Sequence, residues 1–151
     1  MITTLKITLM RGRYYEADWA ANIELDDSST FAEIHDAIQK AVGFDNDHGF
    51  SFFFSRSDRS RNGEYIDDDD ELIDTRTVKD IFPPPKKQSL FYLFDWGDAW
   101  VFRVTKTRKG LQQALPGVAY PRVESESGIK PDQYPSDEDD EDDEDDEEDE
   151  D

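Results

Sequence analysis

Two apolar runs separated by a short polar turn constrain the fold of this chain most strongly. Residues 90–94 read LFYLF, residues 100–104 read WVFRV, and Asp95-Trp96-Gly97-Asp98 lies between them. Short apolar runs bounded by glycine and aspartate are typical of neighbouring strands joined by a tight turn. The segment therefore predicts a β-hairpin.

Three further stretches show strand character. Apolar and polar residues alternate over Leu5–Leu9 and over Trp19–Leu25, which is the period of a half-buried strand. Phe50–Phe54 reads FSFFF and predicts a third strand. Asn62-Gly63 is a strong turn signal, and Tyr65-Ile66 after it predicts a short returning strand.

One segment predicts a well-capped helix within residues 26–43. Thr30 and Glu33 have the spacing of a capping box, and Gly43 stands where a left-handed residue ends a helix. The apolar residues between them fall on one helical face: Phe31, Ile34, Ile38, Ala41 and Val42. Residues 77–82 predict one capped turn, which the prolines at 83–85 end.

The order of these elements predicts an α+β fold. A single domain over residues 1–136 would pack one main helix on one face of a mostly antiparallel sheet. The strand–strand–helix–strand start is β-grasp-like. After Lys106 the pattern decays into chain rich in proline and glycine, which we expect to be extended or looped as far as Pro135.

The formal net charge of −21 is concentrated at one end. Residues 137–151 are all Asp or Glu, and such a segment is expected to be disordered because it has no apolar surface to offset the entropy of ordering. Of the 38 acidic residues, 15 lie in this tail, which leaves 23 against 17 basic residues. The sequence has no cysteine, no apolar run of membrane-spanning length and no secretory leader pattern. We therefore expect a cytoplasmic protein without membrane contact.

Three segments in order resemble the plasmid pRiA4b ORF-three-like family. They are TFAEIHDAIQKAVGFDNDHGFSFFF at Thr30–Phe54, FYLFDWGDAW at Phe91–Trp100 and PRVESESGIKPDQYP at Pro121–Pro135. Members of that family also occur as passenger proteins of insertion elements. The resemblance covers roughly residues 3–136, supports the α+β fold and implies no particular reaction.

The chain departs from the family pattern at positions that bear on chemistry. Phe102 stands where the family often has histidine, and Ser127-Gly128 stands near the place of a Gly-Gly pair. The chain also lacks the cysteine that many members carry in the closing region. A metal or nucleophile role that used those positions is therefore not expected here.

The turn between the apolar runs is the main candidate site. In a structural interpretation Gly97 takes a positive φ, the two aspartates accept turn amides, Trp100 is buried and Trp96 covers the loop. In a functional interpretation Asp95 and Asp98 bind a cation or act as an acid–base pair. The candidate binding residues are Asp95, Trp96, Asp98, Arg122 and Tyr134, and no catalytic residue or metal ligand is assigned.

Two weaker patterns have structural explanations that we favour. Residues 58–69 partly imitate a calcium loop, but position twelve is Asp69 instead of glutamate, and Asn62-Gly63 fits a hairpin turn. His35 and His48 are the two histidines of the chain. We expect each to be a hydrogen-bonded structural histidine, and no cofactor is predicted.

Three functions remain open. The first is a non-catalytic protein-interaction module, whose acidic tail binds a basic partner. The second is a mobile-element protein associated with nucleic acid. Its basic residues would include Arg103–Lys109, with Lys86-Lys87 as a smaller cluster, and its tail would mimic DNA or block that surface. The third is a metal-dependent enzyme using Asp95, Asp98 and a histidine.

Overall fold

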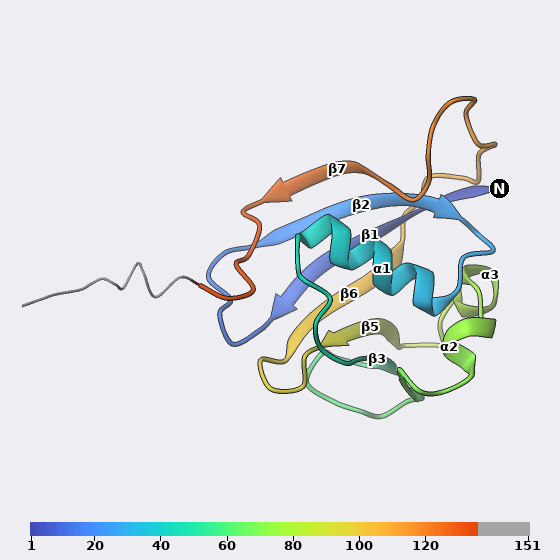
Figure 1. Cartoon of the computed structure of the whole chain (residues 1–151). Coiled ribbons are helices and arrows are strands. Elements are labelled where there is room, and N and C mark those ends of the chain that lie inside the picture. The colour runs from blue at the N-terminus through green and yellow to red at the C-terminus, as the bar shows by residue number, and fades with distance from the viewer. Residues whose placement is uncertain (136–151) are drawn as a thin grey trace, which may run out of the picture.

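The computed structural model describes residues 1–135. The predicted hairpin lies inside a seven-stranded sheet. Neighbouring strands are antiparallel, in the order β4-β3-β5-β6-β1-β2-β7 (Figure 1). The strands are β1 Ile2–Arg11, β2 Trp19–Asp26, β3 Phe50–Ser55, β4 Tyr65–Asp67, β5 Ser89–Phe94, β6 Trp100–Lys106 and β7 Arg122–Gly128. The predicted tail, residues 137–151, lies outside the described part.

The main helix, α1 (Phe31–Val42), begins and ends as predicted. The Thr30 side chain accepts a hydrogen bond from the backbone of Glu33, whose carboxylate accepts from the Thr30 backbone, and Gly43 is left-handed with φ 79°. Two short helices follow, α2 (Leu72–Thr75) and α3 (Val78–Ile81), and Thr77 with Asp80 forms the predicted cap of α3. No helix within residues 1–135 is long and apolar enough to cross a membrane.

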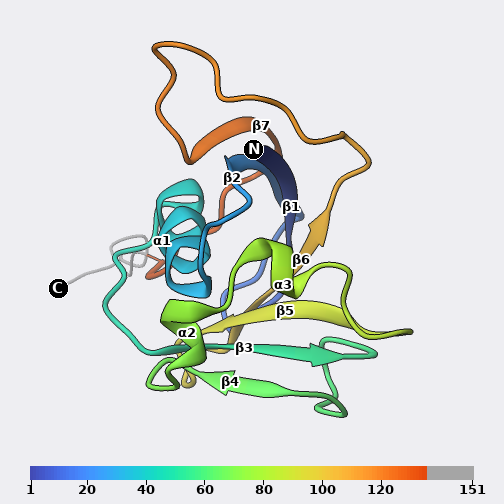
Figure 2. The same cartoon turned by 90° about the vertical axis from the view of Figure 1, so that its right-hand side faces the viewer.

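The sheet is apolar on both faces at its centre, which explains why the runs in β5 and β6 do not alternate. The helix α1 lies over one face of the sheet (Figure 2). Because successive side chains point to opposite faces, Tyr92 and Phe102 join the large core cluster that includes α1, while Phe91 and Val101 join a smaller cluster on the other face. The β3–β4 loop contributes to the rear side, where the Arg61 guanidinium lies 3.9 Å from the ring centre of Phe53.

The arrangement of helices and strands differs from the sequence-based expectations in three places. The β-grasp-like start is not confirmed, because β3 pairs with β4 and β5 and not with either strand of the first hairpin. The segment after Lys106, expected to be extended or looped, contains β7, an edge strand of the sheet whose seven residues are all exposed. The sequence did not predict this strand because its residues show no alternation of buried apolar and exposed polar positions. Its pairing partner β2 also lies about a hundred residues earlier. The short helix α2 was also not predicted.

Candidate functional site

The turn between β5 and β6 is built around the Asp95 side chain. Its Oδ1 accepts hydrogen bonds from the backbone amides of Gly97 at 3.0 Å and Asp98 at 3.3 Å, as the structural interpretation predicted. The left-handed residues are Asp95 (φ 64°) and Ala99 (φ 51°). The prediction that Gly97 carries the positive φ is therefore wrong, because Asp95 itself adopts the left-handed conformation, which aspartate tolerates.

Asp98 connects the turn to the first hairpin. Its carboxylate lies 3.7 Å from Arg13 Nη1, and its backbone carbonyl accepts the Arg13 amide at 2.8 Å. No turn amide donates to the Asp98 carboxylate, so the two aspartates have different roles.

The other carboxylate oxygen of Asp95 faces His48, which lies on the loop between α1 and β3. Asp95 Oδ2 is 3.5 Å from His48 Nε2, and the same nitrogen is 2.8 Å from the Tyr134 hydroxyl. Tyr134 donates to Asp47 Oδ2 at 2.6 Å. Because the Tyr134 hydroxyl donates its proton to Asp47, the Tyr134 oxygen accepts a hydrogen bond from His48. The His48 proton is therefore on Nε2.

This chain of hydrogen bonds changes the acidities of its members. The bond to the Asp47 carboxylate raises the pKa of Tyr134 to about 12. Hydrogen bonds from Tyr134 and from Gln133 lower the pKa of Asp47. The Gln133 side chain donates to Asp47 Oδ1 at 2.8 Å and accepts from the Asp45 amide at 2.7 Å. Residues 133–134 are thus fastened to the loop before β3.

Trp96 is presented to solvent by the same turn but cannot move freely. Its side chain is 51% exposed, while its ring lies so close to Gly49 that an added Cβ there would be 2.0 Å from the ring carbon Cζ3. Its Nε1 lies 3.4 Å from the Tyr65 hydroxyl, and Tyr65 and Tyr134 are themselves exposed. We call the exposed residues Trp96, Tyr65, Tyr134, His48 and Asp47, together with the buried Asp95, the aromatic–acidic patch.

Of the five candidate binding residues, Asp98 shares the turn but faces Arg13 and is not part of the patch, and Arg122 lies apart from both. It is paired with Glu24 across β7 and β2, and its Nε donates to Glu24 Oε1 at 2.7 Å. Lys109 donates to the other oxygen at 3.1 Å. Burial opposes ionisation of Glu24, but these two hydrogen bonds outweigh it, so the pKa of Glu24 is lowered.

His35 lies in a separate buried network under the sheet-facing side of α1. Its Nε2 donates to Asn46 Oδ1 at 2.8 Å, and its Nδ1 accepts from the Tyr92 hydroxyl. Gln39 donates to the same hydroxyl at 3.0 Å. Burial lowers the pKa of His35 and raises the pKa of Tyr92, which favours the neutral form of both side chains. The expectation of a hydrogen-bonded structural histidine is confirmed for His35.

The structure assigns no metal-binding geometry to these residues. Within residues 1–135, no three His, Asp or Glu side chains come together in a way that would hold a metal ion. In the calcium-like stretch, Asn62 Oδ1 accepts from Ser55 Oγ and from the Arg56 amide, both at 2.9 Å. This asparagine therefore closes the β3–β4 loop.

Sequence reasoning named His48 as one of two histidines but did not include Asp47, His48 or Tyr65 among the candidate binding residues. Asp47, His48 and Tyr65 lie in loops or at a sheet edge, and nothing in their local pattern points toward the β5–β6 turn. The one available signal was the polar stretch ending in Gly49 just before a strand of large aromatic residues. Glycine at such a position indicates close approach of another group, which is the Trp96 ring.

Comparison with known proteins identifies the family. A family model described as plasmid pRiA4b ORF-3-like protein matches residues 2–147. The chain belongs to this family. In this member, residues 91–100, one of the three segments that carried the resemblance, form most of β5, the turn of the candidate site and the start of β6.

A solved structure has the same fold. It is a protein of unknown function, MM3350, from Methanosarcina mazei Go1, with 17% sequence identity and a TM-score of 0.61. The similarity covers 83% of this chain and 68% of that chain. At this identity the likeness shows a shared fold alone. No curated protein matches the sequence.

Proposed function

We propose that this pRiA4b ORF-3-like protein is a non-catalytic interaction module that binds a basic segment of a protein partner through the aromatic–acidic patch. The observation that carries this proposal is Trp96, which is half exposed on a fixed turn. Tryptophan and tyrosine are enriched among residues that dominate binding energy at protein interfaces. An exposed indole held against Gly49 loses little further freedom when a partner covers it.

The charge around the patch favours a cationic partner. The carboxylates of Asp47 and Asp95 flank His48, and the sequence adds fifteen acidic residues beginning three positions after Tyr134. Such a field attracts basic segments and accelerates their association. Lysine and arginine side chains also stack favourably on an exposed tryptophan ring. We propose the cytoplasm as the setting of this interaction.

The alternatives have less support from the geometry. For nucleic acid, Lys109 and Arg122 already bind Glu24, and Arg103 lies over the Phe91 ring with its guanidinium carbon 5.6 Å from the ring centre. Fewer cations of this cluster are thus free for phosphates. For metal-dependent catalysis, Asp98 faces Arg13, while Asp95 faces His48. The two carboxylates therefore do not converge on one ion.

The proposal can be tested in cells with the full chain. A photo-crosslinking phenylalanine derivative at position 65, where the exposed Tyr65 lies beside Trp96, should capture a specific basic partner. The same amino acid at position 115, where Leu115 is 56% exposed on the projecting 107–121 loop (Figure 2), serves as the matched control. The partner is then purified and titrated against variants of this protein.

The titration decides the proposal. Trp96→Ala should weaken binding by about thirtyfold, which corresponds to about 2 kcal/mol for a central aromatic residue. Leu115→Ala should leave the affinity unchanged. Equal affinities for the wild type and Trp96→Ala, or a partner whose binding does not weaken with added salt, would contradict a patch that recognises a basic segment.

A further inference from the structure

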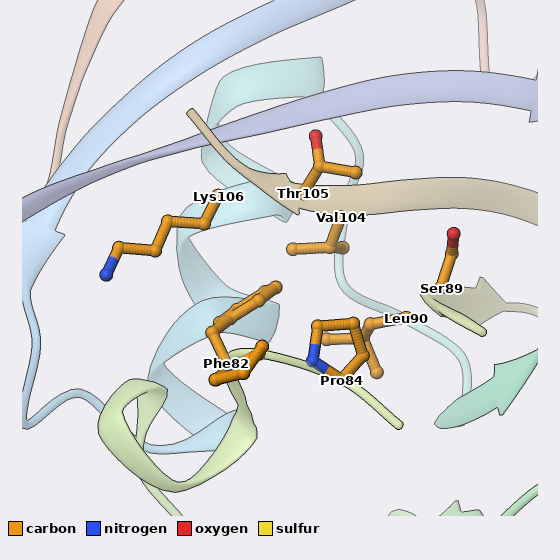
Figure 3. A pocket seen from close by; sticks show the side chains of 8 residues that line it. Phe82, Pro84, Ser89, Leu90, Val104, Thr105 and Lys106 are labelled. Carbon is orange, nitrogen blue, oxygen red and sulfur yellow. The ribbon is translucent and has the colours of Figure 1, made fainter. Parts of the chain in front are cut away.

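An apolar pocket opens at the end of the β5–β6 hairpin opposite to the Asp95–Asp98 turn. It has a volume of about 390 Å³ and lies between Phe82 and Pro84 on one side and Leu90 and Val104 on the other (Figure 3). Pockets that bind small molecules typically have roughly 300–1,000 Å³ and mostly apolar walls. The pocket is therefore large enough for a small ligand and has the lining of such a site.

The walls of the pocket come from rigid parts of the fold. Leu90 and Val104 are directly paired residues of β5 and β6 and belong to the core under α1. Phe82 directly follows α3, whose start is held by the cap between Thr77 and Asp80. The prolines after Phe82 restrict the backbone because their rings fix φ. A ligand would thus meet a preformed cavity.

The rim of the pocket is positively charged. Lys106 is the one charged residue among those lining it, and its side chain extends along the edge in Figure 3. Lys86 and Lys87 lie in the turn that connects the Pro84 wall to the start of β5, and all three lysines are exposed. Within residues 1–135, none of them lies within ion-pair distance of a carboxylate.

We propose that this pocket binds a small amphiphile with an apolar body and an anionic headgroup, of the class of a medium-chain carboxylate. The apolar body would fill the space between Phe82 and Val104, and the headgroup would lie at the rim near Lys106. Uncompensated lysines beside an apolar cavity favour an anion over a neutral or cationic ligand of the same shape. This site is independent of the aromatic–acidic patch.

Binding can be located with decanoate as the probe. The full-length protein, with labelled leucine and valine methyl groups, is titrated and followed by NMR. Methyl signals of Leu90 and Val104 should shift, while those of Leu93 and Val101, which lie in the cluster on the other face of the sheet, should not. Decyltrimethylammonium, with the same chain and a positive headgroup, should bind about tenfold more weakly.

Matched variants test the two parts of the pocket. Lys106→Glu should weaken decanoate binding by about tenfold. Lys40→Glu makes the same charge change at an exposed position on α1 and should have no effect. Phe82→Ala, at a half-buried wall residue, should weaken the binding of both amphiphiles alike.

The proposal is overturned if decanoate shifts the Leu93 and Val101 signals as much as those of Leu90 and Val104, or if the two lysine variants bind decanoate with the same affinity. It is also overturned if the pocket is filled by Leu111 or Leu115 of a second copy, seen as a dimer that Leu115→Ala dissociates.

Discussion

Removing one buried hydroxyl should destabilise the protein far more than its size suggests. The Tyr92 hydroxyl bonds both His35 Nδ1 and Gln39 Nε2, and Tyr92 is fully buried. Tyr92→Phe keeps the ring packing but leaves two buried polar groups without their partner. Each lost hydrogen bond costs about 1 kcal/mol, and a buried group left unsatisfied costs about 1–3 kcal/mol. We expect the free energy of unfolding to fall by about 3 kcal/mol.

Urea unfolding at pH 7, followed by tryptophan fluorescence, measures this change. The midpoint should fall while the dependence on urea concentration stays the same, because the surface exposed on unfolding is nearly unchanged. Tyr15→Phe is the matched control, since the Tyr15 hydroxyl binds Asp18 at an exposed site where water can replace it, and it should leave the urea midpoint nearly unchanged. An equally small effect of Tyr92→Phe would refute the inferred network.

Three other predictions concern the patch, the helix and pH. Gly49→Ala should displace the Trp96 ring, which a new Cβ would overlap, and should cost about 1–3 kcal/mol with a red-shifted tryptophan emission; an unchanged spectrum would contradict the close contact. Thr30→Ala removes the cap of α1 and should cost about 1 kcal/mol in urea unfolding, whereas Thr30→Ser should cost little. Burial lowers the pKa of His35 in the folded state, so the unfolded chain takes up the proton first. Stability should therefore fall as pH drops below about 6.5, and His35→Gln should show a shallower fall over the same range.

The candidate site was only half visible in the sequence. The turn residues Asp95, Trp96 and Asp98 stand together in the chain, so a local pattern was enough to select them. Their contacts come from Asp47-His48 and from Tyr134, and the hydrogen bond between His48 and Tyr134 joins residues 86 positions apart. Arg122 was named with them as a candidate binding residue, but pairing of β7 with β2 places it beside Glu24.

The sequence by itself determined the elements whose signals are local. The Thr30 and Gly43 caps, the apolar face of α1 and the apolar runs of β5 and β6 depend on residues a few positions apart, and each formed as predicted. Only the tertiary structure decided where β3 pairs, that β7 forms at all, and which loops meet at the Asp95 turn. These features depend on backbone pairing and packing between distant segments. The stability of such pairing depends on which distant surfaces come into contact, and the local pattern of apolar and polar residues does not specify those contacts.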